Sequence, residues 1–209
     1  TILDMNGNTL VPASSTLTVD TLNPTVLDVT ASDLMISDAD ATGSFTIAVT
    51  FSEAMDTAVN PALVFAPDVS GSLTFTGGSW DMSGTVYTAA YSVTDAGVTL
   101  TDITVDVTGA LDASGNTQED YTAAVEFSID TENPLVIIAE DNADGVVSDA
   151  DSVVNYTLTF SEAVQAVTAA DLTILGGTLT SGPILAADGL SATFQVTAAD
   201  GSTADLSVT

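Results

Sequence analysis

The sequence contains no lysine, arginine, histidine or cysteine, although aspartate and glutamate together number 29 and give a formal net charge of −29. Without basic residues to contact phosphates, nucleic-acid binding is excluded as an expected function. Catalysis by a Ser–His–Asp triad, a Cys–His pair or a lysine Schiff base is excluded too, as are zinc sites built from cysteine and histidine. The carboxylates therefore depend on solvent or bound metal for counter-charge, and Ca²⁺ is the natural candidate because it prefers oxygen ligands.

The chain also lacks any run of 18 apolar residues, so we expect no membrane insertion. Its hydrophobic content of 45% and mean hydropathy of +0.40 are nevertheless too high for an acidic disordered tail. A length of 209 residues is enough for one large or two ordinary domains with buried cores.

Short runs of alternating apolar and polar residues are spread along the sequence, and Gly, Asp, Asn or Pro interrupts them about every 8 to 12 residues. The clearest runs are SFTIAVTF (44–51), YTAAYSV (87–93), ITVDV (103–107), NYTLTF (155–160) and SATFQVT (191–197). An alternation of period two in residues rich in Val, Thr, Phe, Ile and Tyr is typical of half-buried β-strands. The sequence therefore predicts an all-β protein of the sandwich type.

An internal repeat with a period of about 110 residues divides the chain. The recurring marks are VDTLNP (19–24) and IDTENP (129–134), SDAD (37–40 and 148–151), and FSEAM (51–55) and FSEAV (160–164). Their constant order makes chance similarity implausible. We therefore predict one complete domain over residues 22–131 and the start of a second domain at residue 132.

The second domain, 132–209, is predicted to lack its last strand. Its final segment ADLSVT (204–209) matches the penultimate strand of the first domain, whereas the missing loop and last strand resemble residues 1–21. Laying Thr209 on Thr108 places Thr1 on Gly109 with no gap. Two interpretations stay open: one period of a continuous rod, or a filament subunit whose residues 9–20 complete the second domain of a neighbouring subunit by donor-strand complementation.

Several motifs together resemble the bacterial immunoglobulin-like domains of large surface adhesins. They are the DTxNP linkers (20–24 and 130–134), FSEAM and FSEAV, DLTILGGTL (171–179) and LDASGN (111–116). The resemblance implies tandem Ig-like β-sandwiches of about seven strands each with Greek-key connections, of which the last lacks its final strand. It also implies an extracellular or cell-surface location, identical units joined end to end, stiffening by Ca²⁺, and a distal binding module.

Strand direction in such sandwiches predicts that acidic residues gather at the joints between domains. At the joint between the two domains the predicted set is Asp38, Asp40, Asp130, Glu132 and Glu162, completed by Asp4 and Asn8 if an N-terminal segment fills the second domain. The corresponding positions elsewhere are Asp20, Glu53, Asp56, Asp112, Asn116, Asp149 and Asp151. Converging carboxylates repel one another unless a divalent ion is bound, which predicts Ca²⁺ sites. The alternative is that Asp, Asn and Gly simply form turns and keep the surface soluble.

Paired carboxylates can catalyse glycoside hydrolysis. Here, however, the acidic residues recur with the period of the repeat, which favours architecture over catalysis, so we predict no enzymatic activity. The expected function is a structural repeat of an extracellular, Ca²⁺-stiffened rod that projects a binding function from the cell. The alternative is a filament subunit joined head to tail.

Overall fold

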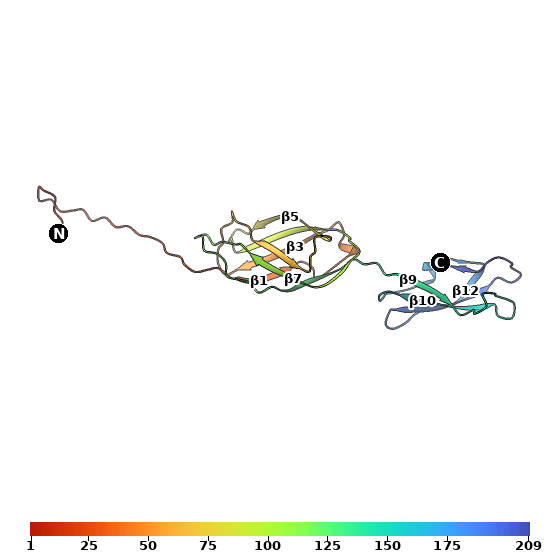
Figure 1. Ribbon diagram of the computed structural model, residues 1–209. Helices are drawn as coiled ribbons and strands as arrows, with labels where there is room; N and C mark the ends of the chain where they lie inside the picture. The colour runs from red at the N-terminus through yellow and green to blue at the C-terminus, as the bar shows by residue number, and fades with distance from the viewer. The chain divides into compact units, whose positions relative to one another are not determined.

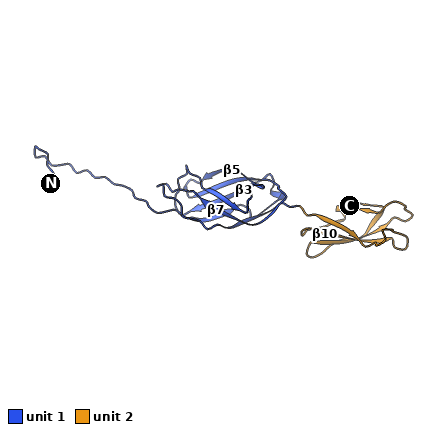
Figure 2. Cartoon of the chain, in the orientation of Figure 1, with its two compact units in different colours: residues 1–132 blue, residues 133–209 orange.

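The computed structural model describes all 209 residues and consists of β-strands with two short 3₁₀ helices (Figure 1). The chain divides into two compact units, unit 1 of residues 1–132 and unit 2 of residues 133–209 (Figure 2). The predicted all-β class is confirmed. Both helices are three residues long, and no helix has the length and apolar character needed to cross a membrane.

Unit 1 is a sandwich of two four-stranded sheets. One sheet has the order β1-β3-β6-β5 and the other the order β2-β8-β7-β4. The bounds are β1 Val26–Ala31, β2 Met35–Ser37, β3 Ser44–Phe51, β4 Ala62–Ala66, β5 Leu73–Trp80, β6 Val86–Val93, β7 Thr99–Thr108 and β8 Ala124–Asp130, with the 3₁₀ helix η1 at Asp38–Asp40.

The core of unit 1 forms because the strands alternate as their sequences predict. In β3, Phe45, Ile47, Val49 and Phe51 are all buried, and the residues between them are more exposed. β6 and β7 follow the same pattern toward the space between the sheets. Twenty buried apolar residues make up this single core, which is the arrangement expected when each sheet has one apolar face.

The last strand of unit 1, β8, lies inside its sheet. It pairs in parallel with β2 on one side and antiparallel with β7 on the other. Phe127 is 2% exposed and Ile129 is fully buried. The Phe127 ring lies 4.7 Å from that of Phe45 in the opposite sheet. β8 therefore closes the sandwich and contributes to its centre.

Unit 2 has the same first sheet and a much smaller second one. Its four-stranded sheet has the order β12-β13-β10-β9, and only the two-residue strands β11 and β14 form a second sheet. The bounds are β9 Val136–Glu140, β10 Val153–Phe160, β11 Ile174–Leu175, β12 Gly177–Leu185, β13 Ser191–Ala198 and β14 Ser207–Val208, with the 3₁₀ helix η2 at Ala169–Asp171. Six apolar residues are buried. Unit 2 contains no strand in the positions of β2 and β8.

Candidate functional site

Three carboxylates from distant parts of the sequence meet at one end of unit 1. Asp20 precedes β1, Glu53 follows β3, and Asp112 follows β7, yet one carboxylate oxygen from each lies within 4.8 Å of the others. We call these three residues the acidic cluster. β3 ends where β1 begins, as their antiparallel pairing requires, and the segment after β7 reaches the same end through the bridge between Asp112 and Met55.

The loop that carries Asp112 is held rigidly by hydrogen bonds. The Asp112 carboxylate is almost fully buried and accepts the backbone N–H of Ser114 at 2.8 Å, the N–H of Asn116 at 2.8 Å and the Asn116 side-chain amide at 2.7 Å. Burial opposes ionisation of Asp112, but these hydrogen bonds outweigh it and hold its pKa below the ordinary value. Asp112 is therefore a charged group inside the fold.

Among the three residues of the acidic cluster, Glu53 has a carboxylate oxygen that lacks a hydrogen-bond partner. Its Oε1 atom is buried and has no hydrogen-bond partner. Burial, followed by the negative charges of Asp20 and Asp112, raises the pKa of Glu53. Asp20 lies across the loop, where its Oδ2 accepts a hydrogen bond from the Ser114 hydroxyl at 2.9 Å. An unpaired buried carboxylate oxygen is costly, so this position favours a bound cation or a proton.

The sequence could predict the members of the acidic cluster but not all of their contacts. Sequence analysis missed Ser114, which no acidic or amide pattern marks. Asp56, predicted beside Glu53, lies outside the cluster and accepts the backbone N–H of Ala58 at 3.0 Å within its own turn. Asn116 belongs to the site through Asp112 and through a 3.4 Å hydrogen bond from its side-chain amide to the Asp20 carbonyl oxygen.

At the opposite end of unit 1, three of the four predicted acids have local hydrogen-bond partners. Asp40 accepts the Ser37 N–H at 2.8 Å and the Ser37 hydroxyl at 3.0 Å, which caps the helix η1 that also contains Asp38. Thr99 donates its hydroxyl to Asp130 at 3.0 Å and to Glu132 at 3.3 Å. No three of these acids approach closely enough to share a cation within unit 1. The predicted joint site also includes a residue of unit 2 and stays a prediction.

The predicted residues of unit 2 repeat this division of roles. Asp151 caps its turn through the N–H of Ser148 at 2.8 Å and the Ser148 hydroxyl, and Asp149 lies in the same turn. Glu162, the counterpart of Glu53, also has a buried Oε1 atom without a hydrogen-bond partner. Its combination with acids of unit 1 stays a prediction.

Asp4 and Asn8, near the N-terminus, bond to each other as Asp112 and Asn116 do. The Asp4 carboxylate accepts the Asn8 N–H and the Asn8 side-chain amide, both at 2.8 Å. The Asn8 side chain is the main cause of the lowered pKa of Asp4. The two turns are thus copies in geometry as well as in sequence.

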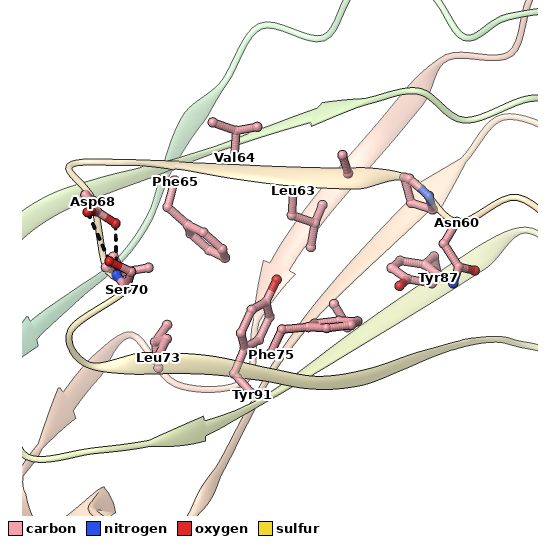
Figure 3. A pocket seen from close by; sticks show the side chains of 14 residues that line it. Asn60, Leu63, Val64, Phe65, Asp68, Ser70, Leu73, Phe75, Tyr87 and Tyr91 are labelled. Carbon is pink, nitrogen blue, oxygen red and sulfur yellow. Dashed lines mark hydrogen bonds between the residues drawn. The ribbon is translucent and has the colours of Figure 1, made fainter.

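A hollow in unit 1, with a volume of about 590 Å³, lies between the edge strands β4 and β5 (Figure 3). Figure 3 shows Phe65, Phe75 and Tyr91 turned toward one another in it, and the rings of Phe65 and Phe75 approach that of Tyr91 at 5.5 and 5.6 Å. Burial, followed by the neighbouring Tyr87, raises the pKa of Tyr91 to about 12. These rings lie at the side of the core that is next to the edge strands β4 and β5.

Comparisons of the chain with models of known protein families and with curated proteins find no match. The function proposed below therefore depends on the geometry of the two units and the repeat in the sequence.

Proposed function

We propose that this chain is a structural segment of an extracellular fibre built from Ig-like domains in tandem. The observation that carries the proposal is strand order. The sheets β1-β3-β6-β5 and β2-β8-β7-β4 correspond to the ABED and CFG sheets of an Ig constant-type sandwich, with β2 as an extra strand beside the last one. The first sheet recurs in unit 2 as β9-β10-β13-β12. Two successive units of one architecture in a periodic sequence are what a repetitive rod requires.

The role proposed for the chain is architectural rather than catalytic. The acidic cluster belongs to motifs that recur with the repeat, and the corresponding Glu162 of unit 2 has the same unpaired oxygen. A site repeated in each unit serves the joints of a fibre better than it serves a single reaction. The partners we propose are further units of the same kind, joined end to end outside the cell.

We also propose that the acidic cluster binds Ca²⁺. Ca²⁺ accepts about six to eight oxygen ligands in flexible geometry, and carboxylates are its preferred protein ligands. Asp20, Glu53 and Asp112 supply oxygens within 4.8 Å of one another, and the unpaired Glu53 Oε1 is the atom that most needs a cation. A bound ion would join the segment before β1 to two loops of unit 1 and so restrict bending there.

Adding Ca²⁺ should raise the melting temperature of unit 1. At a free concentration about 100 times the Kd, binding to the folded form alone contributes about 2.7 kcal/mol. For a domain of this size that corresponds to roughly 10 °C or more in Tm. Differential scanning calorimetry with Ca²⁺ and with EDTA measures the change, and identical Tm values in both would contradict the proposed site.

Replacing Glu53 with Gln should have opposite effects with and without Ca²⁺. Because the pKa of Glu53 is raised in the folded state, its ionisation destabilises the fold as pH rises through that pKa. In EDTA at pH 7, Glu53→Gln should therefore raise Tm, and the advantage should vanish below pH 4. When Ca²⁺ is added, the Tm of the variant should rise by less than the Tm of the natural chain.

Asp56→Asn provides the matched control, since it removes one negative charge from the same turn but outside the cluster. It should leave the Ca²⁺ response of Tm unchanged. Equal responses from Glu53→Gln and Asp56→Asn would mean that Ca²⁺ acts through total charge and not through the cluster.

The location and fibre form are tested on intact source cells. Antibodies raised against unit 1 should label filaments outside the cell in electron micrographs. Labelling confined to the cell interior would contradict the proposed extracellular fibre. The mass of the denatured fibre then separates the two arrangements: about 21 kDa indicates separate chains, and several hundred kilodaltons indicates one continuous polypeptide.

A further inference from the structure

Unit 2 contains a groove of about 790 Å³ at one end of its sandwich. One wall consists of residues 145–149, after β9, and the other of residues 199–206, before β14. The residues of both walls lie outside the strands of unit 2. Unpaired N–H and C=O groups at a sheet position are prone to pair with an added strand.

The two walls correspond to the two neighbours of β8 in unit 1. Through the repeated SDAD motif, Val147 and Ser148 match Ile36 and Ser37 of β2. Through the match of Thr209 with Thr108, residues 200–208 align with β7. In unit 1 the strand between β2 and β7 is β8. The groove of unit 2 therefore lies where its own last strand belongs.

The walls of the groove are not strands, although the segments that match them in unit 1 are β2 and β7. β7 is ten residues long, but its counterpart β14 is only two. The counterpart of β2 is not a strand. The second sheet therefore has four strands in unit 1 and two in unit 2, because β2 and β8 have no counterparts there.

We propose that this groove binds residues 14–20 of a second copy of the chain. In the DT-x-NP alignment, Leu17 and Val19 match Phe127 and Ile129. The first pair is 88% and 80% exposed, whereas the second pair is 2% and 0% exposed. One chain thus carries an exposed segment whose apolar positions match those of β8, and a groove whose walls match the two neighbours of β8.

The turn at residues 3–9 independently supports the proposed contact between the N-terminal segment and unit 2 of a second copy. Leu3 bridges to Thr9 as Leu111 bridges to Thr117 in unit 1. The Asp4 N–H donates to the Asn8 carbonyl at 2.9 Å, and the Asp112 N–H donates to that of Asn116 at 3.0 Å. The N-terminal turn therefore has the same geometry as the turn at residues 111–117, although it is not docked against a domain.

Unit 1 shows where such a turn attaches. The Asp56 N–H donates to the Leu111 carbonyl at 2.8 Å, and Met55 forms a bridge to Asp112. The counterparts of Met55 and Asp56 in unit 2 are Val164 and Gln165. A second copy docked there places Asp4 beside Glu162, as Asp112 lies beside Glu53 in unit 1.

Each chain offers one strand and one groove at different places, so the contact joins unlike surfaces and does not close on itself. Head-to-tail strand addition of this type propagates into filaments. The inference rests on the proposed fibre function and names its partner, a second copy of this chain. If the purified chain did not associate but antibodies still labelled surface fibres, the proposed fibre function would stand. Only the binding of residues 14–20 to the groove of a second copy would be contradicted.

Leu17→Asp in the 209-residue chain tests the contact directly. Sedimentation velocity is measured with Ca²⁺ and at 0.5 M NaCl, which screens the −29 charge. The natural chain should form concentration-dependent polymers, and Leu17→Asp should weaken association on the order of 100-fold or more. Equal association of the two chains, or a monomeric natural chain in both solutions, would overturn the proposal.

Thr16→Glu is the matched control, because unit 1 already carries Glu126 at the corresponding position of β8. It adds the same charge one residue away and should leave association intact. Hydrogen exchange supplies the second measurement: residues 200–206 should become protected when the natural chain polymerises, and a synthetic peptide of residues 1–20 should protect them in Leu17→Asp. Protection in a monomeric natural chain would mean that the strand comes from the same copy, and it would also overturn the proposal.

Discussion

Joining a second copy of residues 1–24 to Thr209 should stabilise unit 2 by about 3 kcal/mol. Leu17 and Val19 of the added copy would become buried, and full burial of such side chains contributes roughly 1.5–3 kcal/mol each. Ordering the added strand offsets part of this gain. Residues 200–206 would also gain a partner and extend β14. Calorimetry should show the melting transition of unit 2 moving upward, while that of unit 1 stays in place.

The same extension should abolish self-association, because the groove would be filled from within the chain. A control extension with Leu17→Asp and Val19→Asp in the added copy adds equal length without the apolar side chains. It should leave both the Tm of unit 2 and the association unchanged. If both extensions stabilised unit 2 equally, the added length and not strand insertion would be the cause.

Phe127→Ala should destabilise unit 1 by about 3–5 kcal/mol, the usual cost of truncating a buried phenylalanine. Phe127 is 2% exposed, and its ring lies 4.7 Å from that of Phe45 and 6.1 Å from that of Phe65. The cavity would open between the two sheets at the position that corresponds to Leu17 in the proposed contact. Urea unfolding should show a lower midpoint for unit 1 and no change for unit 2.

Val125→Ala on the same strand is the control for Phe127→Ala. Val125 is 56% exposed, so its truncation should change the free energy of unfolding by about 0.5 kcal/mol or less. A loss of under 1 kcal/mol for Phe127→Ala would mean that β8 contributes little to the core, which would also weaken the account of the groove in unit 2.

The regular strands could be predicted because each has a strong local pattern. SFTIAVTF forms β3 over the predicted residues, since one face of it is entirely apolar and β-branched or aromatic side chains fit a pleated surface. The meeting of Glu53 with Asp112 followed from strand direction alone. These features depend on period and order, which a sequence displays directly.

The roles of the remaining acids could not be predicted, because local hydrogen bonds compete with long-range clustering. Asp40 and Asp151 satisfy their carboxylates within three residues, through Ser37 and Ser148. Nothing in the composition separates such a capping aspartate from one that reaches a cation site. The repeat predicted that the second domain lacks its last strand, but not which residues line the groove, because they belong to two segments of unit 2 that lie far apart along the chain.

The parallel pair β2 and β8 has a mechanical consequence for unit 1. β2 belongs to the N-terminal end of the fold and β8 to the C-terminal end, and they run in the same direction. Tension applied through the chain ends would slide one strand along the other, so the pairs Met35–Ser128, Ile36–Ile129 and Ser37–Asp130 would bear the load together. Forced unfolding is governed by the unfolding rate. The barrier to unfolding is higher when the hydrogen bonds between two strands must break together than when they break one after another. Unit 2 would bear load in this way only after a strand had entered its groove.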